Sequence, residues 1–260
     1  MGFAPDWLSL RAPADRAARD AGLLARALAL GPEQIVDLGA GTGATLRAMK
    51  AAQPLRARWT LVDNDPALLA LAPRLEGRVT CIQADLTDLG ALPLHGASLV
   101  TASALLDLVS DAWLGGLVAR LAEHGLPFYA ALSYDGAMSW TPPDPADADV
   151  THAFNADQRS DKGFGPALGP DGATRAARLF QAAGYTVELA QSPWVLGPQD
   201  RALQAELLDG IAAAATRAGY SGSPAWLAAR HAALGHAQAL IGHIDLLAVP
   251  PEAPERKAHG

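Results

Sequence analysis

The chain has 260 residues, half of them apolar, which is enough for one large α/β domain with a sizeable core. Its 20 lysines and arginines stand against 27 aspartates and glutamates, and the resulting net charge of −7 disfavours a nucleic-acid partner. A single cysteine, Cys81, excludes an intrachain disulfide, and its VTCI context predicts a buried strand position. We find no apolar run long enough to cross a membrane and no secretion-signal layout, so we expect a cytoplasmic protein.

Helices and strands alternate along the first half of the chain. Apolar spacing predicts an N-terminal helical segment over 1–31, with its helix at 12–30. Strands spaced by helices indicate βαβ units and a parallel sheet, in which ligands bind at the carboxyl ends of the strands. The predicted strands are 34–38, 58–63, 78–83, 97–103 and 126–134, and the helices between them are 42–53, 64–75 and 111–124.

The second half is less regular. Residues 135–172 contain several prolines, glycines and aspartates and little periodicity, which indicates either a lid or substrate loop or a plain exposed loop. A helix at 172–185 and a strand at 185–191 follow. Inserted helices are then predicted within 197–240, at 199–218 and 224–240, before a last strand at 241–250 and a loose tail at 251–260. The main domain is thus expected over 32–250.

The stretch IVDLGAGTG, residues 35–43, predicts a strand that runs into a glycine-rich turn. Together with Ala44, this stretch also fits the dinucleotide pattern G-x-G-x-x-A, which favours NAD(P). Asp37 opposes that interpretation, because a carboxylate at the strand end repels a pyrophosphate and attracts a cation, unless it only caps a helix or turn. Asp63 ends the next strand, where a carboxylate can accept hydrogen bonds from both ribose hydroxyls of a nucleoside.

Four segments in order, VDLGAGTG, LVDND, CIQADL and SLVTASALLD, resemble the motif set of the class I S-adenosylmethionine-dependent methyltransferases over residues 33–134. The resemblance implies an enzyme that uses S-adenosylmethionine and releases S-adenosylhomocysteine. It also implies a Rossmann-like α/β fold with a seven-stranded, mostly parallel sheet, an antiparallel C-terminal pair and inserted helices.

The resemblance also implies which residues hold the methyl donor. The first turn and the fourth strand end would line the methionine part, Asp63 would hold the ribose with Asn64 beside the adenine, and Asp85 and Leu86 would contact the adenine. Asp85 could instead be a turn residue only. The implied donor contacts are Asp37, Gly39, Ala40, Gly41, Asp63, Asn64, Asp85, Leu86, Ser103 and Ala104. One of Arg11, Arg16 and Arg19 could pair with the donor carboxylate, although a surface role is the expectation for any single one of them.

Methyl transfer requires in-line positioning and a dry site, and an oxygen or nitrogen acceptor can also require a base. Asp107, after the fourth strand, is a candidate base or cation holder, or simply a helix cap. His152 is the other candidate base, because the ordinary pKa of histidine lies near neutrality. Predicted substrate contacts are Tyr134, Asn155, Arg159, Lys162 and Phe164, and Trp140 or Trp194 could stack on a flat substrate.

The sequence therefore predicts a methyltransferase that acts on oxygen or nitrogen of a small metabolite. No Asn-Pro-Pro-Tyr-type segment follows the fourth strand, which disfavours nucleic-acid or glutamine targets. We expect no metal site, no membrane partner and a possible homodimer. An NAD(P)-dependent oxidoreductase and a non-catalytic nucleoside-binding domain of the same fold stay open as alternatives.

Overall fold

The computed structural model describes residues 4–73 and 78–251. Eight strands in these ranges form one sheet, whose main path runs β3-β2-β1-β4-β5-β8-β6 with β7 paired to β8 beside it. Strands β1 to β5 are parallel, whereas β8 is antiparallel to β5, β6 and β7. The strands are β1 Gln34–Leu38, β2 Arg58–Asp63, β3 Val79–Gln83, β4 Leu99–Ser103, β5 Phe128–Thr141, β6 Thr186–Gln191, β7 Trp194–Leu196 and β8 Gln238–Val249. The predicted Rossmann-like sheet is confirmed, and β7 is an addition to it.

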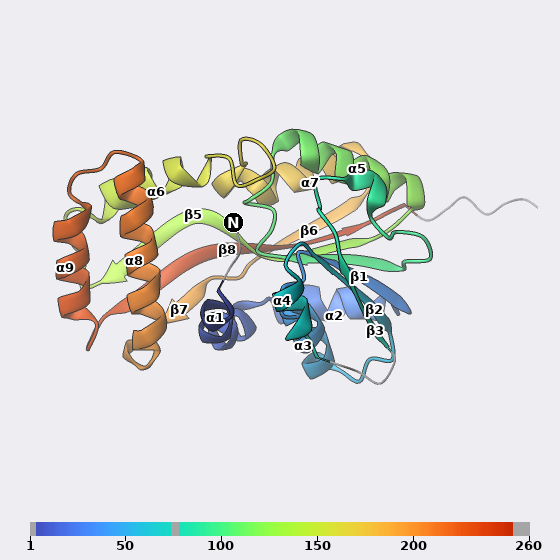
Figure 1. The fold of residues 1–260 in the computed structure, drawn as a ribbon, viewed down its shortest axis with the longest axis horizontal. Coiled ribbons are helices and arrows are strands. Elements are labelled where there is room, and N and C mark those ends of the chain that lie inside the picture. The colour runs from blue at the N-terminus through green and yellow to red at the C-terminus, as the bar shows by residue number, and fades with distance from the viewer. Residues whose placement is uncertain (1–3, 74–77, 252–260) are drawn as a thin grey trace, which may run out of the picture.

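Helices cover both faces of this sheet (Figure 1). α5 and α7 lie on one face, and α2, α3 and α4 lie on the other. The α-helices are α1 Pro5–Ala18, α2 Ala21–Ala29, α3 Ala44–Ala52, α4 Pro66–Ala70, α5 Asp111–His124, α6 Asp147–Gln158, α7 Gly172–Ala182, α8 Arg201–Arg217 and α9 Ser223–Ala233, and short 3-10 turns span Leu89–Ala91, Gly169–Asp171 and Pro198–Asp200. Within the described ranges, no helix combines the length and apolarity that a bilayer crossing requires.

The side chains of the central strands alternate between the two faces of the sheet, and each face has its own apolar core cluster. In β1, Ile35 packs into the cluster beneath α2 and α3, whereas Val36 and Leu38 pack into the cluster beneath α5 and α7. Successive side chains of a strand point to opposite faces, so a strand covered on both sides needs a continuous apolar run. The carboxyl end of β1 is therefore held rigidly from two sides.

A third apolar cluster lies where β5 and β8 extend past the parallel strands (Figure 1). Here α6, α8 and α9 pack around buried aromatic side chains, among them Trp140 and Trp226, whose ring centroids are 5.3 Å apart. Residues 135–172 are consequently more regular than the predicted loop: 135–141 continue β5 and 147–158 form α6. Packing of α6, α8 and α9 around the third apolar cluster stabilises this order.

Several predicted boundaries were wrong. The single helix expected at 12–30 is two helices, because the backbone of Arg19 turns extended and Asp20 caps α2 by accepting from Leu23 N at 2.6 Å. Of the helix expected at 64–75, only 66–70 is helical, and 74–75 lie outside the described residues, as does the predicted tail beyond 251. The last inserted helix ends at 233, and β8 begins at 238. Cys81 is exposed, because β3 is an edge strand.

A fully buried carboxylate, Asp245 of β8, joins four separate segments. Its Oδ2 accepts from Asp20 N at 2.9 Å, and its Oδ1 accepts from Leu132 N at 2.8 Å and Ser192 Oγ at 2.6 Å. Tyr129 Oη donates to it more weakly at 3.4 Å. Leu132 lies at a bulge of β5 with φ 57°, a left-handed conformation that costs free energy for a branched side chain. Asp245 offsets that cost by satisfying the buried N–H.

We expect Asp245→Ala to lower the free energy of unfolding by about 2–4 kcal/mol, because buried donors on several segments would lose their acceptor. Urea denaturation of the variant and the parent measures this. Asp149→Ala, an exposed aspartate of α6, is the control and should change stability by less than about 0.5 kcal/mol. Equal stability of Asp245→Ala and Asp149→Ala would contradict the role given to Asp245.

Candidate functional site

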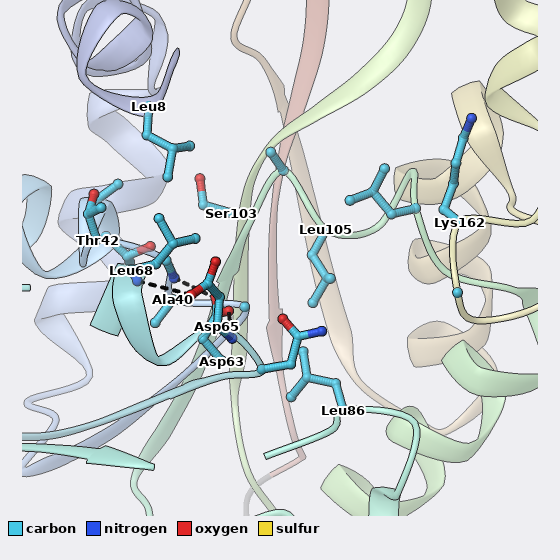
Figure 2. A pocket seen from close by; sticks show the side chains of 18 of the residues that line it. Leu8, Ala40, Thr42, Asp63, Asp65, Leu68, Leu86, Ser103, Leu105 and Lys162 are labelled. Carbon is cyan, nitrogen blue, oxygen red and sulfur yellow. Dashed lines mark hydrogen bonds between the residues drawn. The ribbon is translucent and has the colours of Figure 1, made fainter. Parts of the chain in front are cut away.

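A cavity of about 280 Å³ lies at the carboxyl ends of β1, β2, β3 and β4 (Figure 2). We name it the first cavity. It lies where the strand order reverses between β1 and β4, which is the usual ligand position in an open α/β sheet. The turn after β1 forms one wall of this cavity. Its glycines Gly39 and Gly41 have φ of 63° and 51°, a left-handed backbone conformation that favours residues without a Cβ.

Asp63 is fixed at the end of β2 by two backbone donors. Gly41 N donates to its Oδ2 at 2.7 Å and Asp65 N to its Oδ1 at 2.9 Å, as the dashed lines in Figure 2 show. Each carboxylate oxygen can accept a second hydrogen bond. Asp63 lines the first cavity and thus presents two pre-oriented acceptors to a ligand that carries neighbouring hydroxyls.

Apolar side chains supply the remaining walls of the first cavity. Leu8 comes from α1 and Leu68 from α4, while Leu86 and Leu105 follow β3 and β4 (Figure 2). A flat apolar group is bound between such side chains, with polar groups at the edges setting its orientation. The exposed carboxylate of Asp85, next to Leu86, provides one edge acceptor.

Two buried charged groups near this end of β1 have atoms without hydrogen-bond partners among the described residues. Arg19 donates through Nη2 to Ser103 Oγ at 3.1 Å, while its Nε and Nη1 have no acceptor. Asp37 accepts from Thr101 Oγ1 at 2.7 Å through Oδ1, while its Oδ2 has no donor. Burial raises the pKa of Asp37 to about 6, although Thr101 and the positive charge of Arg19 oppose that shift.

A second cavity of about 160 Å³ lies between α1, β5, β7, β8, α6 and α8. Aromatic and aliphatic side chains form most of its surface, including Trp7 of α1 and Trp194 of β7. The two cavities share Ala104 and Leu108, in the turn after β4. Ligands bound in the two cavities would therefore be close to each other, with the small side chain of Ala104 at the boundary.

Polar side chains in the second cavity are few. Asp107 is buried, its Oδ1 has no partner within the described part of the chain, and burial raises its pKa to about 6. His243 of β8 has a pKa lowered to about 3, chiefly by burial and then by Arg11, so the ring is neutral. Its Nδ1 contacts the Ile241 carbonyl at 3.0 Å and must donate there, which leaves Nε2 as an acceptor.

The structure brings together most of the predicted donor contacts. Asp37 is the exception: it is 1% exposed and lies beneath the turn rather than in the wall. The predicted residues that line the first cavity are Gly39, Ala40, Gly41, Asp63, Asn64, Asp85, Leu86, Ser103 and Ala104.

The predicted catalytic and substrate residues are scattered. Asp107 and Tyr134 line the second cavity, and Lys162 and Phe164 line the first. Asn155 lines neither cavity but accepts from Tyr134 Oη at 2.8 Å.

Two of the predicted residues lie away from both cavities. His152 is on the exposed side of α6, whose buried face is Val150, Ala153 and Asp157, and this explains why the candidate base does not reach either cavity. Arg159 is exposed and paired with Asp171.

Several wall residues were not predicted. α1 contributes Leu8, Ala12 and Asp15 to the first cavity and Trp7 and Arg11 to the second. Within each set the residues are three, four or seven positions apart, so each set lies on one face of the helix. The sequence alone does not predict which parts of the protein those two faces contact. Trp194, proposed from sequence as a stacking surface, does line the second cavity, whereas Trp140 is buried against Trp226.

Comparison with known proteins agrees with this architecture. Residues 35–125 match the family model described as a methyltransferase domain. This segment, which begins in β1 and ends just after α5, is therefore similar to that family of methyltransferase domains.

Individual proteins are similar to a larger part of the chain. The trans-aconitate 2-methyltransferase of Klebsiella pneumoniae (strain 342) is 32% identical over 171 residues, which are 64% of each protein, so the match spans less than two thirds of that relative. A cyclopropane-fatty-acyl-phospholipid synthase-like protein from Lactobacillus casei ATCC 334 aligns with a TM-score of 0.57 at 16% identity, covering 95% of this chain and 94% of its own. A type II methyltransferase described as putative, from Anaeromyxobacter dehalogenans, aligns with a TM-score of 0.51 at 17% identity, and the alignment covers 89% of this chain and 96% of that protein. These two structures show the shared fold.

The raised pKa of Asp37 predicts a pH dependence of stability. A carboxyl whose pKa is higher in the folded than in the unfolded chain stabilises the fold at low pH, and this contribution is lost as the pH rises through the folded value of about 6. Between pH 5 and pH 8 the free energy of unfolding of the wild type should therefore fall by about 1 kcal/mol more than that of Asp37→Asn. Urea midpoints of both proteins at the two pH values test this, and parallel changes would contradict it.

Proposed function

We propose that the chain is a methyltransferase that binds S-adenosylmethionine in the first cavity and methylates an oxygen or nitrogen atom of a small molecule in the second. The observation that supports this most strongly is Asp63, whose carboxylate is pre-oriented at the end of β2 beside the glycine turn. Bound S-adenosylmethionine supplies an electrophilic methyl group on a sulfonium. The role of the chain is to hold the nucleoside, orient the acceptor and exclude water.

The first cavity fits the parts of this donor. Asp63 would accept from the ribose hydroxyls, while Leu86 and Asp85 would contact the face and edge of the adenine. Among the described residues, Arg19 has unpartnered buried N–H groups, and Ser103, which it contacts, lines the cavity. Of the three N-terminal arginines considered from sequence, Arg19 is therefore our candidate for the donor carboxylate.

Charge distinguishes this donor from NAD(P). The turn 39–43 follows Asp37 in sequence and donates from Gly41 N to Asp63, so a pyrophosphate bound at this turn would be repelled by two carboxylates. S-adenosylmethionine has no phosphate and carries an ammonium and a sulfonium. The same comparison makes NADH the appropriate competing ligand in a binding test.

We expect S-adenosylhomocysteine to bind the purified protein in a calorimetric titration and NADH not to bind. Asp63→Ala should weaken S-adenosylhomocysteine at least about tenfold, because two hydrogen bonds to a charged acceptor are lost. Asp85→Ala should weaken S-adenosylhomocysteine binding less, because Asp85 is exposed. This substitution leaves the glycine turn intact. Asp149→Ala is the control with unchanged affinity. NADH binding without S-adenosylhomocysteine binding would overturn the proposal.

A further inference from the structure

The walls of the second cavity indicate the kind of molecule that it accepts. Four aromatic rings line it, and they lie in two pairs: Trp7 and Trp194 have centroids 6.4 Å apart, and Tyr134 and Phe154 have centroids 5.5 Å apart. An apolar cavity of about 150 Å³ is known to hold a benzene-sized ring. At about 160 Å³, the second cavity is of that size.

The cavity has little capacity for negative charge. Arg11 is the cation among the described lining residues, and both its Nε and Nη2 are bonded to the carboxylate of Asp15, at 2.9 and 3.0 Å. Its guanidinium also lies 5.0 Å from the ring centre of Trp194, whose Nε1 donates to the same Asp15 at 3.1 Å. A ligand carboxylate would have to share the charge of Arg11 with Asp15 and would face the carboxyl of Asp107.

Two polar groups of the wall supply free hydrogen-bond acceptors, and the side-chain amide of Gln158 supplies both an acceptor and a donor. Asp107 Oδ1 is buried without a partner among the described residues, and His243 has its Nδ1 occupied by the Ile241 carbonyl. A ligand that satisfies these atoms must donate hydrogen bonds. Aromatic walls, a neutralised cation and unpaired acceptors together specify a ring that carries a hydroxyl.

We propose that the second cavity binds an uncharged, single-ring phenol, with the hydroxyl directed at Asp107, and that it excludes polycarboxylates. This inference rests on the proposed function and refines it. It also separates this chain from its trans-aconitate-methylating relative, because a molecule with several carboxylates has no unpaired cation here among the described lining residues.

The reaction that follows balances without a further reagent. The phenol oxygen forms a bond to the methyl carbon, the carbon–sulfur bond breaks, and its electron pair stays on sulfur as a thioether. The hydroxyl proton passes to the carboxylate of Asp107. A buried carboxyl whose pKa is raised toward neutrality is a more effective base at neutral pH than an ordinary one.

The first experiment compares two ligands that share a ring and a hydroxyl. In calorimetric titrations of the protein saturated with S-adenosylhomocysteine, 4-ethylphenol should bind at least tenfold more tightly than 4-hydroxyphenylacetate, and trans-aconitate should not bind. Tighter binding of either carboxylate would overturn the inference. If S-adenosylhomocysteine itself does not bind, the proposed function fails instead, and titration of the phenol alone still tests the cavity.

A pair of tryptophan substitutions locates the binding. Ile211→Trp, from α8, fills the second cavity and should abolish 4-ethylphenol binding while S-adenosylhomocysteine binding persists. Val195→Trp is the matched control, because Val195 is 74% exposed on β7. Melting curves of both variants check their folding. Retained phenol binding in a folded Ile211→Trp would place the phenol elsewhere and overturn the inference.

The role of Asp107 has its own test. Asp107→Asn should lower turnover of 4-ethylphenol at least a hundredfold with S-adenosylhomocysteine affinity unchanged, and Asp149→Asn should change neither. Wild-type turnover should rise with pH through about 6, where Asp107 ionises, and then level off.

The charged and titratable groups that face Asp107 or share its cavity are Arg11 of α1, Tyr134 of β5, Lys162 after α6 and His243 of β8. His243, with a pKa near 3, does not titrate in this window, and burial raises the pKa of Tyr134 far above it. A rise through pH 6 that persists in Asp107→Asn, or loss of turnover in His243→Asn alone, would overturn the assignment of the base.

Discussion

The carboxylate of Asp245 is the constraint on which both cavities depend. It holds the start of α2 through Asp20 N, and it holds the left-handed bulge of β5 through Leu132 N. The first contact fixes where the N-terminal helices lie, and α1 lines both cavities. The second fixes a residue in the wall of the second cavity. One buried acid at the centre of the sheet therefore sets the geometry of surfaces contributed by segments more than a hundred residues apart.

The site divides into parts of different origin. The first cavity is made by turns at the ends of short parallel strands, which both core clusters hold from two sides. The second is made where β5 and β8, of 14 and 12 residues, run past those strands to meet α6 and α8. Among the described residues, Ala104 and Leu108 line both cavities, while α1 contributes different residues to each. The proposed nucleoside site and the proposed acceptor site thus have almost separate sets of residues.

The sequence predicted the mostly parallel sheet with its antiparallel C-terminal strands and most of the first cavity, because the wall residues that it identified lie at strand ends in local motifs. Asp63 is an example, since a β2 pattern and its last residue suffice to place it. The second cavity was poorly predicted, because Trp7, Arg11 and His243 meet only through tertiary packing. His152 was chosen for its chemistry, yet burial of Val150 and Ala153 turns it to the opposite side of α6.

Helix α1 has a consequence for how ligands communicate. This 14-residue helix forms part of the wall of both cavities. Leu8 and Ala12 line the first cavity, and Trp7 and Arg11 line the second. A ligand that immobilises α1 from one side also orders the wall offered to the other ligand, and lowers the entropic cost of the second binding step. Thermodynamic linkage makes this reciprocal: any factor by which one ligand tightens the other must operate equally in the opposite direction.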